Sequence, residues 1–249
     1  METNINDIET FIFIHDQDIL LDFIGKNKFT DIHNFKWVFL GKNPVDKLSS
    51  IKNIIVARDL EDNIEQYPKL TSFTGWYALY KNGLLKSKYV NLFEYDIKYI
   101  PEFVDINKEI IKNNFDFIGY FPMSIFDVVY IKESRYSNEL INSVRHKENK
   151  DIVDMINNLS PNTTWSSSSN STWKVDVLKK YLDWFTLYID DIKDSIYCGH
   201  MHERSISFYY FLENLNVKLT QGLMFHAQLN SHGTSPLPPE RAKQMYNLL

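Results

Sequence analysis

The sequence predicts a single-domain α/β protein, in which helices flank a mostly parallel central sheet. Short apolar runs alternate with longer stretches of helical periodicity through the first half of the chain. This alternation is typical of parallel sheets that are covered on both faces. The 249 residues suit one large domain, and no linker or internal repeat divides them. Because ligands of such sheets bind beyond the carboxyl ends of the strands, those ends are the first places to look for a site.

The first half of the chain contains the clearest elements. Residues 70–85 predict a helix, because Trp76, Leu79, Tyr80 and Leu84 recur at helical spacing. Apolar runs bounded by turn-forming residues predict strands at 10–15, 35–41, 51–59 and 88–93.

The second half is predicted to contain more helix. Residues 163–173 form a low-complexity, serine-rich stretch that we interpret as a loop. Apolar periodicity predicts strands at 115–121 and 126–132, helices at 134–159, 173–196 and 201–215, one or two strands within 217–229, and a Pro-rich tail at 236–249.

Composition excludes several classes of protein. The net charge is −5 and no long Lys/Arg run is present, so we expect no nucleic-acid partner. The single cysteine, Cys198, excludes an internal disulfide and a cysteine-based zinc site. The polar N-terminus is unlike a signal peptide, and no apolar run approaches the ~20 residues of a membrane span, so we expect a cytoplasmic protein. Dehydrogenase, P-loop, zincin and α/β-hydrolase signatures are absent from the sequence.

Two acids follow the apolar run of "KYVNLFEYDIK", at residues 88–98. Glu94 and Asp96 are separated by one residue, so on an extended chain their side chains point the same way. Two converging carboxylates suit a hard cation such as Mg²⁺ or Mn²⁺. The alternative is a strand that becomes polar where it meets water.

Three histidines and one acid make a second group of candidates. His200, His202 and Glu203 lie near the predicted start of the 201–215 helix. Glu203 suits either a general base or an acid that the helix dipole favours. The two histidines suit either metal ligands or packed side chains. His226 ends an apolar run and is a third candidate metal ligand, although a single histidine more often serves a core or a turn.

The serine-rich stretch carries a third candidate site. Trp165 and Trp173 flank its hydroxyl-bearing residues, and indole rings stack on sugars while hydroxyl and amide groups bind sugar hydroxyls. The alternative is a surface loop in which Ser171 or Thr172 caps the following helix.

The order of these segments resembles the GT-A glycosyltransferases, which use nucleotide-diphospho-sugars. "YALYKNGLLKSKYVNLFEYD" is similar to the helix and strand that lead into their acidic D-x-D motif, with Glu94 standing in the place of the first Asp. The passage "YLDWFTLYIDDIKDSIYCGHMHERSISFYYFL" resembles small bacterial capsular and exopolysaccharide glycosyltransferases. The resemblance spans residues 10 to 232, and many relatives carry a second acid where this chain has Arg204.

This resemblance implies a site and a reaction. Residues 1–100 would form the half that binds the nucleotide-sugar, most simply a UDP-sugar, and residues 101–235 would bind a glycan or protein-linked acceptor. Asp96, Glu94 and His226 would hold Mn²⁺ or Mg²⁺, and Glu203 would act as the base of an inverting transfer. The implied donor-binding residues are His15, Asp59, Tyr77, Lys81, Asn82, Tyr95 and His232. The implied acceptor-binding residues are Trp165, Asn170, Trp173, His202 and Arg204.

Two other functions remain open at this stage. A metal-dependent hydrolase would use His200, His202, Glu203 and His226 as a cluster. A non-catalytic sugar-binding protein would keep the fold and bind nucleotide-sugars without turnover.

Overall fold

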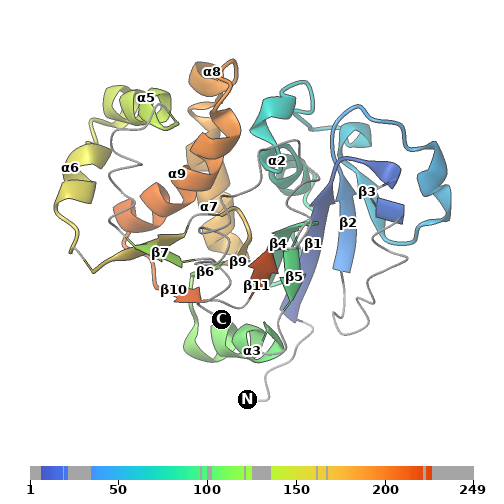
Figure 1. Cartoon of the computed structure of the whole chain (residues 1–249), viewed down its shortest axis with the longest axis horizontal. Helices are drawn as coiled ribbons and strands as arrows, with labels where there is room; N and C mark the ends of the chain where they lie inside the picture. Colours follow the sequence, from blue (N-terminus) through green and yellow to red (C-terminus); the bar gives the residue numbers. More distant parts are fainter. Residues whose placement is uncertain are drawn as a thin grey trace, which may run out of the picture.

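The computed structural model describes residues 7–18, 20–21, 35–95, 97–99, 103–120, 122–124, 136–160, 162–166, 168–220 and 223–225. Its centre is a seven-stranded sheet with the order β10-β6-β9-β4-β1-β2-β3 (Figure 1). The strands are β1 (Ile8–Ile14), β2 (Phe35–Phe39), β3 (Ile54–Val56), β4 (Tyr89–Glu94), β6 (Phe117–Tyr120), β9 (Ser171–Lys174) and β10 (Val217–Thr220). β1 to β4 are parallel, whereas β9 runs antiparallel to both of its neighbours, β4 and β6.

Two small antiparallel ribbons accompany the main sheet. β5 (Ile97–Tyr99) pairs with β11 (Leu223–Phe225), and β7 (Pro122–Ser124) pairs with β8 (Thr164–Ser166). The α-helices are α2 (Phe73–Lys81), α3 (Phe103–Asn113), α5 (Asn138–Glu148), α6 (Ile152–Asn157), α7 (Val175–Thr186), α8 (Ile189–Ile192) and α9 (Cys198–Leu212). Short 3-10 helices are η2 (Asp46–Ser50), η3 (Ala57–Asp59) and η4 (Pro68–Leu70). None of the helices in these described ranges is long and apolar enough to cross a lipid bilayer.

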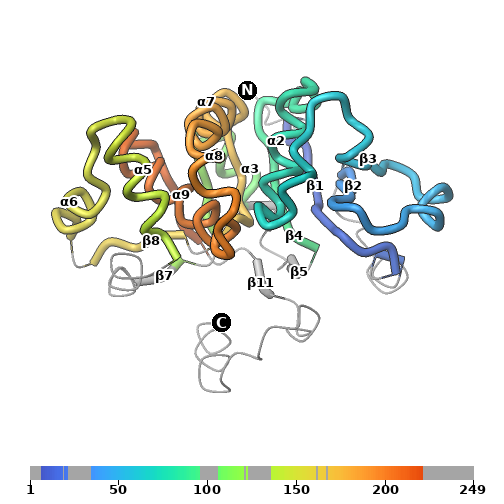
Figure 2. The backbone as a smooth tube through the Cα atoms, turned by 90° about the horizontal axis from the view of Figure 1, so that it is seen from above, coloured from blue at the N-terminus to red at the C-terminus, as the bar shows by residue number. Residues whose placement is uncertain are grey.

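Alternate residues of β4 show how the helices cover the sheet. Val90 and Leu92 belong to the large core that α2, α7 and α9 complete on one face. Tyr89 and Phe93 point to the other face, where they pack with Ile110 of α3. This alternation follows from the two-residue period of a strand. Seen from above, α6, α5 and α9 lie on one side of the molecule and β2 and β3 on the other, with α7, α8 and α2 between them (Figure 2). The predicted α/β class is therefore confirmed.

The serine-rich stretch is not the predicted loop, because its last part forms the buried central strand β9. A row of hydrogen-bonded polar side chains makes this possible. Asn91 of β4 donates to Thr10 Oγ1 at 3.0 Å and accepts from Thr172 Oγ1 at 2.6 Å. Thr172 in turn lies 2.8 Å from the hydroxyl of Tyr120. Since buried hydroxyl and amide groups need partners, this row fixes the register of β1, β4, β9 and β6.

Two helix predictions need correction, and one helix was missed. The 173–196 helix starts after β9 and is divided into α7 and α8. The 134–159 helix is interrupted at Asn149, whose φ of 55° ends α5 in the left-handed region, and Asp151 then caps α6 by accepting from the amides of Val153 and Asp154. Helix α3 was not predicted. The predicted strand at 126–132 lies outside the described residues.

Gly75 provides a stability prediction in which two physical effects oppose each other. A Cβ at this position would lie 2.7 Å from Phe13 and 2.8 Å from Leu40. Helix propensity alone favours alanine by about 1 kcal/mol. Overpacking of the core costs about 1–3 kcal/mol, so we nevertheless expect Gly75→Ala to lower the free energy of unfolding, by up to about 2 kcal/mol after the gain in propensity is subtracted. Urea denaturation measures the change, and a more stable variant would contradict the close packing.

Candidate functional site

Glu94 lies at the carboxyl edge of the sheet, the edge at which the parallel strands β1 to β4 end. It occupies the last position of β4 and pairs in register with Phe13 of β1. Two residues of the serine segment (residues 168–170) contact it. The backbone N–H of Glu94 donates to Asn170 Oδ1 at 2.7 Å, and the Ser169 hydroxyl donates to Glu94 Oε1 at 3.2 Å. The structure thus brings together two candidates that the sequence separates by 76 residues.

The serine segment is itself held rigidly. Ser168, Ser169 and Asn170 are 4%, 4% and 2% exposed. Ser168 Oγ accepts from the Asn170 backbone at 3.1 Å and from its side-chain amide at 2.8 Å. These contacts leave Asn170 with its carbonyl oxygen directed at Glu94. Asn170 was predicted to bind the acceptor, and in this structure it contacts β4.

Helix α9 covers the same face of the sheet as the Glu94 side chain. Glu94 is two residues beyond Leu92, so both side chains lie on the face that α9 packs against. Ser207 of α9 donates to the backbone oxygen of Ser166 at 2.9 Å, and the Tyr210 hydroxyl accepts from the Ser166 N–H at 3.2 Å. Glu203 precedes Ser207 by four residues and Tyr210 by seven, so it lies on the same stripe of the helix. The half-buried Glu203 is therefore on the side of α9 that faces β8.

The sequence had indicated that Glu203 lies near the start of its helix, but the structure places it further along. α9 begins at Cys198, so Glu203 is in the second turn. The helix dipole acts mainly on the first turn, and it therefore does not explain why an acid stands at this position.

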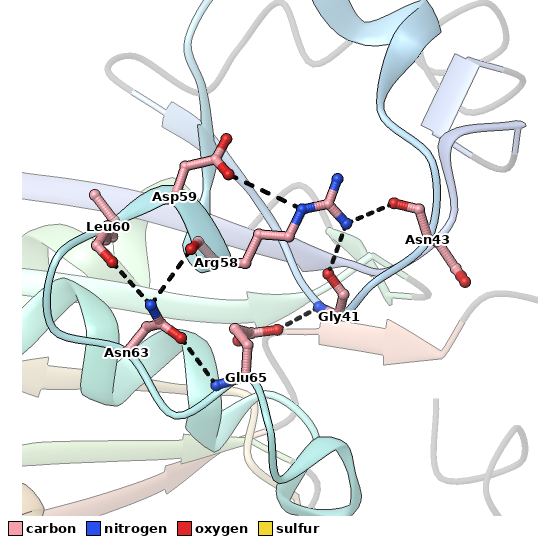
Figure 3. A network of polar contacts seen from close by, with 7 residues as sticks. All are labelled: Gly41, Asn43, Arg58, Asp59, Leu60, Asn63 and Glu65. Atoms are coloured by element: carbon pink, nitrogen blue, oxygen red, sulfur yellow. Dashed lines mark hydrogen bonds and ion pairs between the residues drawn. The ribbon is translucent and has the colours of Figure 1, made fainter.

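The ends of β2 and β3 carry a polar network that the sequence did not predict (Figure 3). Arg58, just after β3, donates to the backbone oxygens of Gly41 at 3.1 Å and Asn43 at 2.8 Å. Asn43 donates to the backbone oxygen of His15, just beyond β1, at 2.7 Å. Asp59 lies 4.0 Å from Arg58, and its side chain is 70% exposed. The network fixes the three loops at this edge relative to one another.

A buried acid completes this network. Glu65 is 3% exposed and accepts a hydrogen bond from the Gly41 N–H, as Figure 3 shows. Asn63 orients this turn, since its Oδ1 accepts from the Glu65 N–H at 3.2 Å while its amide donates to Leu60 O at 2.8 Å. The other carboxylate oxygen of Glu65 has no hydrogen-bond partner among the residues that the structure describes. Gly41 has a φ of 77°, which favours glycine at this turn.

Two of the predicted donor-binding residues meet at the ends of β1 and β4. The exposed His15 ring and the buried Tyr95 ring are 5.7 Å apart, in an edge-to-face arrangement. The Tyr95 N–H donates to Phe13 O at 3.1 Å and so continues the pairing of β4 with β1. Asp59 follows β3, so these three residues lie at the carboxyl edge, and their role in donor binding stays a prediction.

Lys81 and Tyr77 lie on α2, and Asn82 follows its last residue. Lys81 pairs with Asp183 of α7 at 3.4 Å and lies over the Tyr77 ring at 5.7 Å. The Asn82 side-chain amide donates to the backbone oxygen of Asp62, in the loop after η3, at 2.7 Å. The role of these three residues in donor binding stays a prediction.

Trp173 and His202 are core residues, and their burial contradicts the assignment to an acceptor site. Both are 0% exposed. Trp173 stacks on Tyr181 at 5.2 Å and donates through Nε1 to Ser171 Oγ at 2.9 Å. The His202 ring packs edge-on against Trp76 at 4.7 Å. Burial lowers the His202 pKa to about 3, so the ring is neutral at physiological pH.

The other acceptor candidates are also largely covered. Trp165 is 5% exposed and Arg204 is 8% exposed. Arg204 lies over the Tyr136 ring at 5.2 Å and donates to the backbone oxygen of His200 at 3.2 Å. Burial, and then the nearby Arg204 charge, lower the His200 pKa.

Three predicted residues, Asp96, His226 and His232, lie outside the described residues. Within the described part of the chain, no group of three or more His, Cys, Asp or Glu side chains is arranged to hold a metal ion. Glu94 is therefore the member of the predicted metal site that the structure describes.

Comparison with known proteins identifies the fold. No protein-family model and no curated protein sequence matches the chain. The apo structure of WbbM, a bifunctional glycosyltransferase, is similar with a TM-score of 0.62 and 14% identity over 89% of this chain and 45% of WbbM. The apo structure of mouse xyloside xylosyltransferase 1 matches with a TM-score of 0.47 and 11% identity, over 86% of this chain and 84% of that one. The chain thus spans less than half of WbbM, and its mostly parallel sheet with flanking helices is a GT-A-like glycosyltransferase fold.

Proposed function

We propose that the protein is a glycosyltransferase that transfers a sugar from a nucleotide-diphospho-sugar to an acceptor hydroxyl, with inversion at the anomeric carbon. The observation that carries the proposal is the pair of acids on one face of the sheet. Glu94 is held at the carboxyl end of β4, and Glu203 stands on the stripe of α9 that contacts β8. Fold alone does not specify function, so these residues supply the chemical part of the argument.

The residues at the end of β4 fit a hard divalent cation. Mg²⁺ and Mn²⁺ prefer carboxylate oxygens, and Mg²⁺ in phosphate-binding sites is often held by one or two carboxylates together with the substrate phosphates. Glu94 supplies one such carboxylate, and we propose Asp96 and His226 as further ligands. When bound, the cation would neutralise the charge that develops on the departing diphosphate.

Glu203 is the proposed general base. As the acceptor oxygen bonds to the anomeric carbon, the bond from that carbon to the diphosphate oxygen breaks, and the hydroxyl proton passes to the Glu203 carboxylate. One such displacement inverts the anomeric carbon. A half-buried carboxylate suits this role, because it is reachable by substrate and still shielded from bulk water.

The loops after β1, β2 and β3 are the proposed donor side. His15 and Asp59 lie there, Tyr95 follows β4 and packs against His15, and the Arg58 network holds the three loops together. A preorganised loop set reduces the entropy lost on binding a nucleotide.

The hydrolase alternative receives no support from the described residues. It requires His202 to ligate a metal, and that ring is enclosed by Phe73, Trp76, Tyr181 and Phe185. A non-catalytic protein would bind the nucleotide-sugar without turning it over. Detection of sugar transfer, or of slow hydrolysis of the donor, would therefore favour the enzyme.

A thermal-shift screen tests the donor and the cation together. We expect UDP or a UDP-sugar to raise the melting temperature of the wild-type protein in the presence of Mn²⁺, because a ligand at 100 times its Kd stabilises the folded state by about 2.7 kcal/mol. Other nucleoside diphosphates identify the base.

Asp96→Ala should lose the Mn²⁺-dependent part of this shift. Asp190→Asn, which changes an acid of α8 with 83% side-chain exposure, is the control and should keep it. A wild-type protein that responds to no nucleotide, with or without Mn²⁺, would rule out the proposed donor class.

A further inference from the structure

We infer that Ser169 and Asn170 are positioning residues for the Glu94 carboxylate. The serine segment would act as a fixed support behind the proposed metal ligand and would not itself contact the acceptor. This inference rests on the proposed function, because the purpose of the support is to hold Glu94 in the orientation that binds a cation.

The serine segment holds the backbone of Glu94. β4 loses its partner β9 at this point, since the last paired residues are Leu92 and Ser171. The Glu94 N–H therefore has no strand carbonyl from β9 to bond, and the Asn170 side chain takes that place at 2.7 Å. An amide oxygen that replaces a ladder hydrogen bond extends the ordered part of β4 to its final residue.

The serine segment also holds the carboxylate of Glu94. The Ser169 hydroxyl donates to Oε1 at 3.2 Å, which restricts the side-chain torsions of Glu94. A carboxylate that ligates a metal is commonly hydrogen-bonded by a neighbouring group in this way, and loss of that group weakens metal binding.

The support is rigid. Ser168 Oγ fixes Asn170 by accepting from its backbone N–H at 3.1 Å and from its side-chain amide at 2.8 Å. Such local side-chain to backbone bonds are a property of serine-rich turns. All of these residues are at most 4% exposed, so neither solvent nor a sugar competes for the hydrogen bonds.

The serine segment is also connected with α9 by hydrogen bonds. Ser166 Oγ donates to Ser168 O at 3.3 Å, and the backbone of Ser166 is bonded to Ser207 and Tyr210. A chain of hydrogen bonds therefore connects α9, on the side that carries Glu203, with Glu94. It passes through Ser166 and the serine segment. The serine-rich stretch sets the separation between the two acids that the proposed reaction uses.

The experiment compares two deletions of a single hydroxyl. Mn²⁺ affinity in the presence of UDP is measured by electron paramagnetic resonance for the wild type, Ser169→Ala and Ser171→Ala, and melting temperatures confirm folding. We expect Ser169→Ala to weaken Mn²⁺ binding by about 10–100-fold, the usual effect of removing a group that orients a metal ligand. Ser171→Ala removes a hydroxyl that contacts Ser169 and Trp173 without touching Glu94, so it should retain nearly wild-type affinity.

A second comparison separates positioning from general damage. In a Glu94→Gln background, Ser169→Ala should produce little further loss of Mn²⁺ affinity, because the two residues act as one unit. Ser169→Cys keeps the size of the side chain with a weaker donor; it replaces the alanine variant if that variant does not fold, and its affinity should also fall.

The outcomes are distinguishable. Wild-type affinity in Ser169→Ala, or an equal loss in Ser171→Ala, would overturn the positioning role and leave the proposed function standing. Absence of Mn²⁺ binding by the wild type with any nucleoside diphosphate would overturn the proposed function, and this inference with it.

Discussion

Glu203→Gln is expected to lower the kcat of sugar transfer by about 10²–10⁴-fold, the usual contribution of a general base. Glutamine keeps the size and hydrogen-bonding reach of the side chain but cannot take the acceptor proton. Donor affinity should stay within about threefold of the wild type, because the loss belongs to the chemical step and not to binding. Transfer kinetics and nucleotide titrations on the same preparation measure the two quantities separately.

A matched control exists on the same helix. Glu213, at the C-cap of α9, is exposed and lies 3.5 Å from Lys150. Glu213→Gln makes the same chemical change ten residues further along, and it should leave kcat unchanged. If Glu203→Gln retains wild-type kcat, the base lies elsewhere; if it loses donor binding with kcat preserved, Glu203 is a binding residue.

Much of the fold was predictable from the sequence because the first half obeys simple periodicities. β1, β2 and β4 are apolar runs, and α2 has an apolar stripe. β9 escaped prediction because Trp173 is the one apolar side chain among its four residues, and its other buried side chains are hydroxyl-bearing. Thr172 is 0% exposed, yet it is a hydroxyl residue whose burial depends on Asn91 and Tyr120, which are distant in the sequence. A search for hydrophobic periodicity does not detect a strand of this kind.

The candidate site was predictable only where a strand end marks it. Glu94 was found at the end of β4, whereas Ser169, Arg58 and Glu65 were missed, because their significance lies in contacts 17 to 75 residues away.

His202 should make the protein markedly less stable in mild acid. Its folded-state pKa is about 3, against 6.5 for an exposed histidine, because burial disfavours the charged ring. The unfolded chain therefore binds the extra proton as the pH falls below 6.5, whereas the folded chain does not bind it until pH 3. Stability from this group is fully present above pH 6.5 and is lost on acidification, by about 2.5 kcal/mol between pH 7 and pH 4.5.

Urea denaturation at pH 7 and pH 4.5 tests this assignment when the wild type is compared with His202→Phe. The variant keeps an aromatic ring among Phe73, Trp76 and Phe185 but cannot be protonated, so its loss of stability between the two pH values should be smaller by about 2.5 kcal/mol. His146→Gln removes an exposed histidine of α5 and serves as the control for the general effect of losing an imidazole.

Equal pH dependence in the wild type and His202→Phe would mean that the folded protein accommodates the charged ring. Since both His202 nitrogens lack hydrogen-bond partners among the described residues, such accommodation would require the core between α2, α7 and α9 to open. The same measurement therefore reports whether α9, the helix that carries Glu203, is held rigidly against the sheet.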